Sequence, residues 1–229
     1  AFEHWNNAYL ELWQVAPGRE VRRFELPRDV QKIYRTTYHG GFSPDGSLLH
    51  IDSVNGIFIF DALTLRPLIT LPSTHAARAA FHPSGDCFIT GGAEGLQRWP
   101  LRTNSGTVGY DFGPPQSIGP TTVRGSETFS ISLDGEHLAL WDNTGVRVLN
   151  PRQREPTAYL PLLESDGAPT ISASGRWIAA RGKKRGLQIW DARLSTLATN
   201  LNVDVKVSAF SPDDRWLITG GGGEYRSWE

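Results

Sequence analysis

Several groups of residues in this sequence could take part in chemistry, and the most conspicuous is a run of four glycines at positions 220–223. A phosphate-binding loop needs Gly-Lys-Ser or Gly-Lys-Thr after such glycines, whereas Glu224 and Tyr225 follow this run. We therefore interpret it as a flexible hairpin turn. The Gly-x-Ser-x-Gly motif of a hydrolase nucleophile is absent. No convincing set of Ser, His and Asp replaces it, so we expect no catalytic residues and no cofactor.

The histidines are the next candidates, because imidazole is a common metal ligand. The chain contains six: His4, His39, His50, His75, His82 and His137. Their spacing shows neither the pairs nor the cysteine neighbours that are typical of a metal site. His82 occupies the serine position of a repeated turn, where we expect local hydrogen bonding. The sequence therefore predicts no metal site.

The densest group of basic residues comprises Arg181, Lys183, Lys184 and Arg185, in a predicted hairpin loop. These side chains could contact an acidic partner, but phosphate recognition normally spreads many cations over one face. The formal net charge of the chain is −1, and its pI is about 6.7. We favour a solvated loop and expect no nucleic-acid binding and no attraction to an anionic membrane.

A repeated unit of strands must position all these residues. Five copies of a short turn recur, with their first residues 39, 50, 40 and 39 positions apart. The turns are Ser43-Pro44-Asp45-Gly46, His82-Pro83-Ser84-Gly85, Ser132-Leu133-Asp134-Gly135, Ser172-Ala173-Ser174-Gly175 and Ser211-Pro212-Asp213-Asp214. Fourteen residues after each turn, or fifteen in one unit, a large apolar residue closes a strand; these residues are Phe60, Trp99, Leu149, Trp190 and Trp228, and Trp13 closes a sixth unit. Self-similarity at such a period predicts a repeat architecture.

Each unit reads as short strands joined by turns. Cys87 to Thr90 and Leu96 to Trp99 are apolar or branched runs separated by a Gly-rich hairpin, which is the pattern of antiparallel strands. Two more extended stretches complete a unit of four strands. No segment has the apolar spacing of a helix, so we predict an all-β chain with almost no helix. Trp177 and Trp216 occupy the same position two residues after their turns, and we expect both to pack between neighbouring units.

The units resemble WD repeats over the whole chain. Trp190-Asp191 fits the dipeptide of that family, Phe60-Asp61 nearly fits it, and Ser43-Pro44-Asp45-Gly46 fits its turn between the two inner strands. The other closing residues depart from the pattern, since Gln14, Pro100, Asn150 and Glu229 stand in the Asp position. The hairpin Asp of the family is replaced by Asn7, Val54, Ala93, Asn143, Lys184 and Gly222. The resemblance implies a divergent β-propeller of four-stranded blades, held mainly by apolar packing rather than by the family's buried polar network.

We expect one domain over residues 1–229, with repeat units at about 1–26, 27–71, 72–120, 121–163, 164–203 and 204–229. The chain then represents five to six blades with about 22 strands. A closed ring avoids exposed sheet edges, so this count predicts that the chain is incomplete at both ends. The absence of methionine agrees with a piece of a larger protein. Seven blades are the commonest ring in the family that the units resemble, and we expect seven.

The cysteine content and the apolar segments of the chain indicate its cellular compartment. Cys87 is the only cysteine, which excludes an intramolecular disulfide and favours a reducing compartment. No apolar run approaches the length of a membrane span, and the first residues lack the apolar centre of a signal peptide. We therefore predict a cytoplasmic protein without a membrane segment.

The resemblance also implies a function. In a propeller, the hairpins between second and third strands share one face with the linkers between blades, and that face commonly binds proteins. The residues that we expect to bind proteins there are Arg28, Lys32, Tyr34, Arg35, Tyr38, Asn55, Glu94, Asn143, Lys183, Lys184 and Arg185. The first linker is rich in cations and aromatic residues, which protein interfaces favour. We predict a non-catalytic scaffold within a larger signalling or regulatory protein, with partners of unknown identity.

Two alternatives remain open. A propeller enzyme, or the substrate-gating propeller of a hydrolase, would carry its site at the central channel. The innermost strands should then hold acid, base or metal-binding groups, whereas they read as Ala, Val, Phe, Ser and Ile. A structural or ligand-sensing ring that closes only by association with another chain is the third reading.

Overall fold

The computed structural model describes residues 9–13, 21–25, 39–53, 56–72, 78–92, 95–104, 109–119, 128–142, 144–153, 156–161, 168–182 and 186–229. These residues form 22 β-strands and no helix. Every pair of strands among them is antiparallel. The all-β class is therefore confirmed for this part of the chain.

Consecutive strands pair with one another, so each sheet is a simple meander. The first sheet contains β1 (Tyr9–Trp13) and β2 (Val21–Glu25), and the second contains β3 (Gly40–Phe42), β4 (Leu48–Ser53), β5 (Gly56–Asp61) and β6 (Pro67–Leu71). The third contains β7 (Arg78–Phe81), β8 (Cys87–Gly91), β9 (Gln97–Asn104), β10 (Gly109–Phe112) and β11 (Gln116–Ser117). The fourth contains β12 (Phe129–Ile131), β13 (Leu138–Trp141), β14 (Gly145–Leu149) and β15 (Pro156–Pro161). The fifth contains β16 (Thr170–Ile171), β17 (Trp177–Arg181), β18 (Leu187–Asp191) and β19 (Thr196–Leu201), and the last contains β20 (Val207–Phe210), β21 (Leu217–Gly221) and β22 (Glu224–Trp228).

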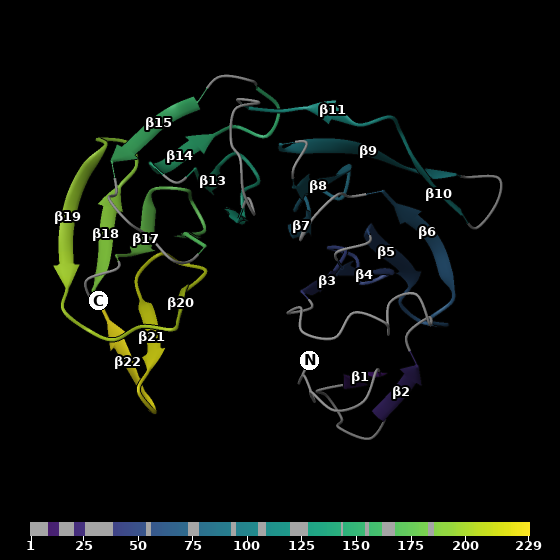
Figure 1. Cartoon of the computed structure of the whole chain (residues 1–229), viewed down its shortest axis with the longest axis horizontal. Coiled ribbons are helices and arrows are strands. Elements are labelled where there is room, and N and C mark those ends of the chain that lie inside the picture. The colour runs from purple at the N-terminus through teal and green to yellow at the C-terminus, as the bar shows by residue number, and fades with distance from the viewer. Residues whose placement is uncertain are drawn as a thin grey trace.

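Figure 1 shows the sheets following one another in chain order along a curved path, with β1–β2 and β20–β22 at its two ends. The first strands of neighbouring sheets lie against each other, since β3 contacts β7, β12 contacts β16 and β16 contacts β20. The outer strands β6, β15 and β19 lie away from these contacts (Figure 1). Several separate four-stranded antiparallel sheets are thus arranged with their first strands on the inside of the curve.

Apolar side chains fill the joints between successive sheets. Leu48 and Ile57 of one sheet pack with Phe88 and Trp99 of the next. Similar clusters join β7–β11 to β12–β15, β12–β15 to β16–β19, and β16–β19 to β20–β22. Because strand side chains alternate between two faces, a sheet in the middle of this series buries both faces. Phe88 and Ile89 on β8 illustrate the result, since both are fully buried and they belong to the clusters on opposite faces of the sheet.

The predicted turns have one repeated geometry. Ser43, Ser132, Ser172 and Ser211 each accept, on Oγ, a hydrogen bond of 2.9–3.1 Å from the backbone N–H five residues further on. The glycines that end four of the turns have φ of 72–75°, a region that glycine adopts without steric cost. This requirement explains why glycine recurs at that position. In the last turn Asp214 takes its place with φ 59°.

The long third unit has an extra strand. β9 continues past Trp99 to Asn104, and its second half pairs with β10, after which β11 returns to pair with Gln97 and Arg98. The prediction that Trp99 closes a strand is therefore wrong, because Leu101 is buried in the apolar cluster beside the preceding sheet and carries the strand onward. The hydroxyl of Tyr110 on β10 donates to Ser47 Oγ in the preceding sheet at 2.6 Å. The longer β9 and the additional strand in this unit account for the spacing of 50 residues between the second and third turns.

Polar contacts add to the apolar packing that was predicted. The indole N–H groups of Trp99 and Trp228 donate to Thr90 and Thr219, both at 3.0 Å, across the strand pairs β8–β9 and β21–β22. Asp61 and Asp191 cap the turn that follows their strands; for example, Asp191 Oδ1 accepts hydrogen bonds from two backbone N–H groups. The Asp of the Trp190-Asp191 dipeptide thus has a local structural role.

Candidate functional site

The predicted protein-binding residues all lie outside the described residues. They are Arg28, Lys32, Tyr34, Arg35, Tyr38, Asn55, Glu94, Asn143, Lys183, Lys184 and Arg185. The described strand ends next to several of them show that the β4–β5, β8–β9, β13–β14 and β17–β18 connections belong to the same edge of their sheets. The prediction of a binding face at this hairpin edge therefore stays a prediction.

One described part of the hairpin edge is hollowed. A cavity of about 330 Å³ is lined by Asn202, Val203, Asp204, Thr219, Gly221, Gly222, Glu224 and Arg226. The glycine run forms the β21–β22 hairpin with Gly222 and Gly223 at φ of 60° and 86°, as expected for a two-residue turn that requires two positive φ angles. Its interpretation as a hairpin turn is confirmed. Two carboxylates face this hollow beside one guanidinium, and Arg226 pairs with Glu224 at 3.0 Å.

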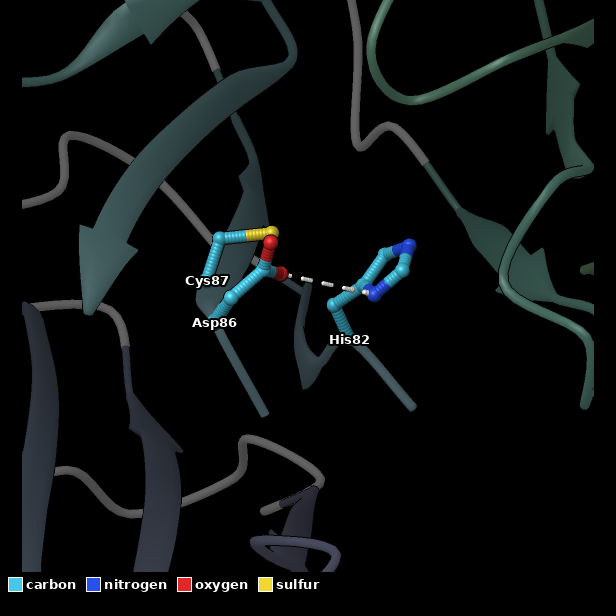
Figure 2. Close-up of side chains that lie close together, drawn as sticks. All are labelled: His82, Asp86 and Cys87. Atoms are coloured by element: carbon cyan, nitrogen blue, oxygen red, sulfur yellow. Dashed lines mark ion pairs between the residues drawn. The ribbon is translucent and has the colours of Figure 1, made fainter. Parts of the chain in front are cut away.

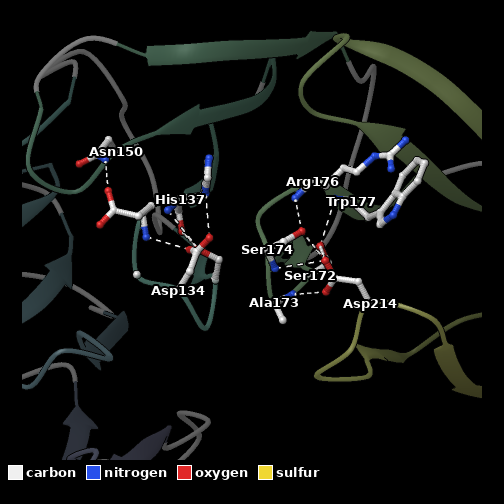
Figure 3. Close-up of polar contacts among 12 residues, drawn as sticks. Asp134, His137, Asn150, Ser172, Ala173, Ser174, Arg176, Trp177 and Asp214 are labelled. Carbon is white, nitrogen blue, oxygen red and sulfur yellow. Dashed lines mark hydrogen bonds and ion pairs between the residues drawn. The ribbon is translucent and has the colours of Figure 1, made fainter.

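The opposite edge carries the repeated turns, which are tied together laterally (Figure 3). Asp214 of the last turn accepts hydrogen bonds from Ala173 N at 2.7 Å, Ser172 Oγ at 3.1 Å and Ser174 N at 3.2 Å, and a further one from Ser174 Oγ. The backbone N–H of Asp134 donates to the carbonyl of Ala173 at 3.2 Å. One further link joins the second turn to the third, where His82 Nε2 lies 2.8 Å from the carbonyl oxygen of Gly135. Four successive turns therefore form one connected row, which we call the turn row: residues 82–85, 132–135, 172–175 and 211–214.

Two histidines, His82 and His137, fit against glycines of the next turn. A Cβ on Gly135 would lie 2.5 Å from the ring of His82, and one on Gly175 would lie 2.3 Å from the ring of His137. His137 Nδ1 is 3.6 Å from Asp134 Oδ2, and the neighbouring Glu136 accepts a hydrogen bond from Asn150. Gly135 and Gly175 thus serve both the backbone conformation and the approach of an imidazole.

Within the described residues, one group of side chains could hold a metal ion: His82, Asp86 and Cys87, whose ligand atoms all lie within 4.8 Å of one another. Figure 2 shows the three side chains converging, with His82 and Asp86 paired. His82 and Cys87 are buried at 2 % and 1 % exposure, while the Asp86 side chain is 41 % exposed. Burial raises the pKa of the Cys87 thiol to about 11, so the free protein holds it as a thiol. The prediction from histidine spacing missed this group, although a histidine five residues before the only cysteine was a signal in the sequence.

A second buried histidine pair lies on β4. His50 Nδ1 is 2.8 Å from Asp52 Oδ1, and both side chains are almost fully buried. Asp52 also accepts a hydrogen bond from Ala79 N of the next sheet at 2.9 Å, and the rings of Phe81 and Phe88 pack edge-on to the imidazole. These contacts give the pair a structural role, joining two sheets within an apolar environment.

A buried acidic residue stabilises the β13–β14 hairpin. Asp142 accepts hydrogen bonds from the backbone N–H groups of Thr144 and Gly145, both at 3.0 Å. It also forms an ion pair with Arg147. Burial acts to raise the pKa of Asp142, but the hydrogen bonds from Thr144 and the nearby Arg147 charge outweigh it and hold the pKa below its usual value. The guanidinium of Arg147 in turn lies 5.3 Å from the ring centre of Tyr159. Asp142 therefore has a structural role in the β13–β14 hairpin.

The first strand of each sheet is relevant to the enzyme alternative, because that alternative requires acid, base or metal-binding groups on the innermost strands. Polar side chains among the described first strands are Arg78, Ser130, Thr170, Ser208 and Ser211 at the following turn. Thr170 and Ser208 bond to each other at 2.9 Å across neighbouring sheets, and burial lowers the pKa of Arg78, although the nearby Asp52 opposes that effect. Thr170 and Ser208 thus join two first strands, and the described part of this region offers no carboxylate or imidazole on β7, β12, β16 or β20.

The last sheet exposes an apolar face. Val207, Ile218 and Tyr225 are 58 %, 51 % and 80 % exposed, and Trp216 is 39 % exposed. In β21, Leu217 and Thr219 are buried towards the preceding sheet, so the alternating positions 216 and 218 belong to the other face. Trp177, at the equivalent position one sheet earlier, packs into the cluster between the last two sheets. The expectation of inter-sheet packing is thus confirmed for Trp177, whereas Trp216 lies on a face that no described sheet covers.

Comparison with known proteins gives no family assignment. No protein-family model matches the chain, and no curated protein has a similar sequence. A search of the described residues for membrane spans found no helix with the length and hydropathy to cross a bilayer.

Proposed function

We propose that this chain is part of a WD-repeat-like β-propeller that acts as a non-catalytic scaffold for protein contacts. The row of meander sheets, their inner first strands and the repeated turns support a propeller, and the number of seven blades that we propose rests on the resemblance to WD repeats. Apolar clusters at successive joints and the hydrogen bonds of the turn row make the sheets a rigid platform. The reduced, buried Cys87 agrees with a reducing compartment such as the cytoplasm.

The exposed apolar face of β20–β22 carries the proposal. Monomeric proteins rarely leave a contiguous apolar patch of this kind uncovered, and such patches commonly mark protein contacts. The face is equivalent to those that bury Leu48, Ile89, Ala139 and Ala179 between earlier sheets. Its natural occupant is therefore the apolar face of another antiparallel sheet, whether from further sequence of the same protein or from another chain.

Affinity capture from cell extract with matched variants tests the function. The first variant, Val207→Lys with Ile218→Lys, changes the exposed face, and the second, Tyr34→Ala with Arg35→Ala and Lys184→Ala, changes the predicted hairpin edge. The control, Leu63→Ser with Leu194→Ser, changes two leucines that are 71 % and 69 % exposed in turns on the opposite edge.

A scaffold predicts that the wild-type chain and the control retain the same bound proteins. It also predicts that at least one of the other variants loses a subset of them. Equal capture by all four chains, or no protein retained by any of them, would contradict the proposal. Sedimentation of the 25.3 kDa chain separates self-association from binding of other proteins.

A further inference from the structure

We propose that His82, Asp86 and Cys87 bind a zinc ion, or a similar transition-metal ion, at the beginning of β8. The donors are His82 Nδ1, Asp86 Oδ1 and Cys87 Sγ, a mixture of nitrogen, oxygen and sulfur that zinc accepts in tetrahedral sites. Zinc bonds of roughly 2.0–2.3 Å place tetrahedral ligands about 3.3–3.8 Å apart. His82 Nδ1 and Asp86 Oδ1 are already 3.7 Å apart. All three ligand atoms lie within 4.8 Å, so a contraction of about 1 Å completes the set.

The repeated turn shows what is unusual here. In four turns the first residue is a serine whose Oγ holds the N–H of the residue five positions later, as in Ser43–Leu48 and Ser132–His137. His82 and Cys87 occupy these same two positions, where the imidazole replaces the hydroxyl. A metal ion between Nδ1 and Sγ would join the side chains at these two positions, in place of the bond from serine to the backbone in the other turns.

The hydrogen-bond partners of His82 are compatible with a metal ion at Nδ1. The carbonyl oxygen of Gly135 can only accept, so Nε2, 2.8 Å away, carries the ring hydrogen. Ser84 N–H points at Nδ1 from 3.2 Å, which requires a lone pair on Nδ1. Ser84 Oγ lies 2.6 Å from the same nitrogen but gives its hydrogen to Asp86 Oδ1 at 2.5 Å. His82 Nδ1 and Asp86 Oδ1 therefore both accept hydrogen bonds from Ser84 and both present lone pairs to a bound metal ion.

Outer contacts orient the ligands as in known metal sites. The Gly135 carbonyl fixes the imidazole, which is the usual arrangement for a ligating histidine. Asp86 Oδ2 pairs with Arg152 at 3.1 Å and lies 3.8 Å from Arg98, and this leaves Oδ1 for the interior. The exposed side of Asp86 gives the ion a path from solvent.

The same contacts determine how tightly we expect the metal ion to bind. Two guanidinium groups oppose a divalent cation electrostatically, and the Cys87 thiol must release its proton to solvent as the metal–sulfur bond forms. We therefore expect weaker binding than at a structural zinc site with four protein ligands.

Titration of the metal-free chain with Co²⁺ tests the proposal. Bound cobalt in this site gives visible ligand-field bands together with a thiolate-to-cobalt charge-transfer band. Cys87→Ser removes the charge-transfer band, and His82→Gln lowers the affinity by more than the roughly 10–100-fold typical of an outer contact. His137→Gln is the matched control, because His137 and Asp134 form a similar pair without a cysteine, and it leaves the spectrum unchanged.

Absence of the charge-transfer band from the spectrum of the wild-type chain overturns the proposal. So does a spectrum that survives in Cys87→Ser or disappears in His137→Gln. If a variant fails to fold, ¹¹³Cd resonance of the wild-type chain reports the ligands directly: a shift for one sulfur with nitrogen and oxygen donors supports the site, and a shift for oxygen donors alone contradicts it. A His82 ring that carries hydrogen on both nitrogens and does not respond to Zn²⁺ also excludes metal binding.

Discussion

Replacing Asp214 with glycine is the sharpest test of how neighbouring sheets are joined. Asp214 holds φ at 59°, a conformation that costs an ordinary residue about 1–2 kcal/mol but costs glycine little. Asp214→Gly therefore removes the carboxylate without adding backbone strain. Any loss of stability then reports on the hydrogen bonds that the carboxylate accepts from the preceding turn, including the one from Ala173 N at 2.7 Å.

The size of the effect follows from these contacts. A hydrogen bond to a charged group contributes about 1.5–3 kcal/mol in favourable cases, and the bonds to Asp214 are partly buried and share one acceptor. Allowing for solvent screening and for relief of strain, we expect a net loss of about 2–3 kcal/mol. For a chain of this size that lowers the midpoint of thermal unfolding by roughly 5–10 °C.

Thermal unfolding followed by far-ultraviolet circular dichroism measures this loss. Asp213→Ala is the control, because Asp213 accepts hydrogen bonds from Ser211 of its own turn and from the backbone N–H of Arg215 directly after it, and we expect a much smaller shift. Equal midpoints for Asp214→Gly and wild type would show that the link between the last two turns does not stabilise the fold. An equal loss in both variants would show that the effect is local to the turn.

Three further predictions use the same measurement. Gly135→Ala should destabilise the chain by at least about 1 kcal/mol more than Gly85→Ala, because both have φ near 75° but only the first meets the His82 ring; equal losses would contradict the close fit. Phe88→Ala should cost about 3–5 kcal/mol because the ring is fully buried between sheets, and a loss below about 1 kcal/mol would refute that packing. The lowered pKa of Asp142 means that its contribution is present above the unfolded value of about 3.9 and is lost as pH falls through the folded value. The fall in stability from pH 6 to pH 3 should therefore be smaller in Asp142→Asn, and an unchanged fall would contradict this role.

The sequence predicted those features that each repeat specifies locally. The Ser–Gly turns need a side-chain acceptor and a positive φ, and the strands need alternating apolar residues, so both are visible as patterns. The prediction failed at Trp99, because continuation of β9 depends on Leu101 and Phe112 packing against a different sheet. Local patterns carry no information about such distant contacts.

The candidate sites were harder to predict for the same reason. Asp214 stands at a glycine position, and nothing in its own turn shows that the carboxylate reaches the preceding one. His82 and Cys87 were read separately, as a turn residue and a core residue, although their spacing matches the Ser43–Leu48 pair that is joined in another turn. Comparing equivalent positions across repeats, rather than searching for known ligand spacings, would have found the cluster.

A crystal structure of the chain would show whether its sheets form a propeller. We expect separate meander sheets whose first strands, β3, β7, β12, β16 and β20, lie around a common axis, with the turn row on one edge. Strands of successive units that pair into one continuous sheet, or first strands that point away from a shared axis, would contradict it.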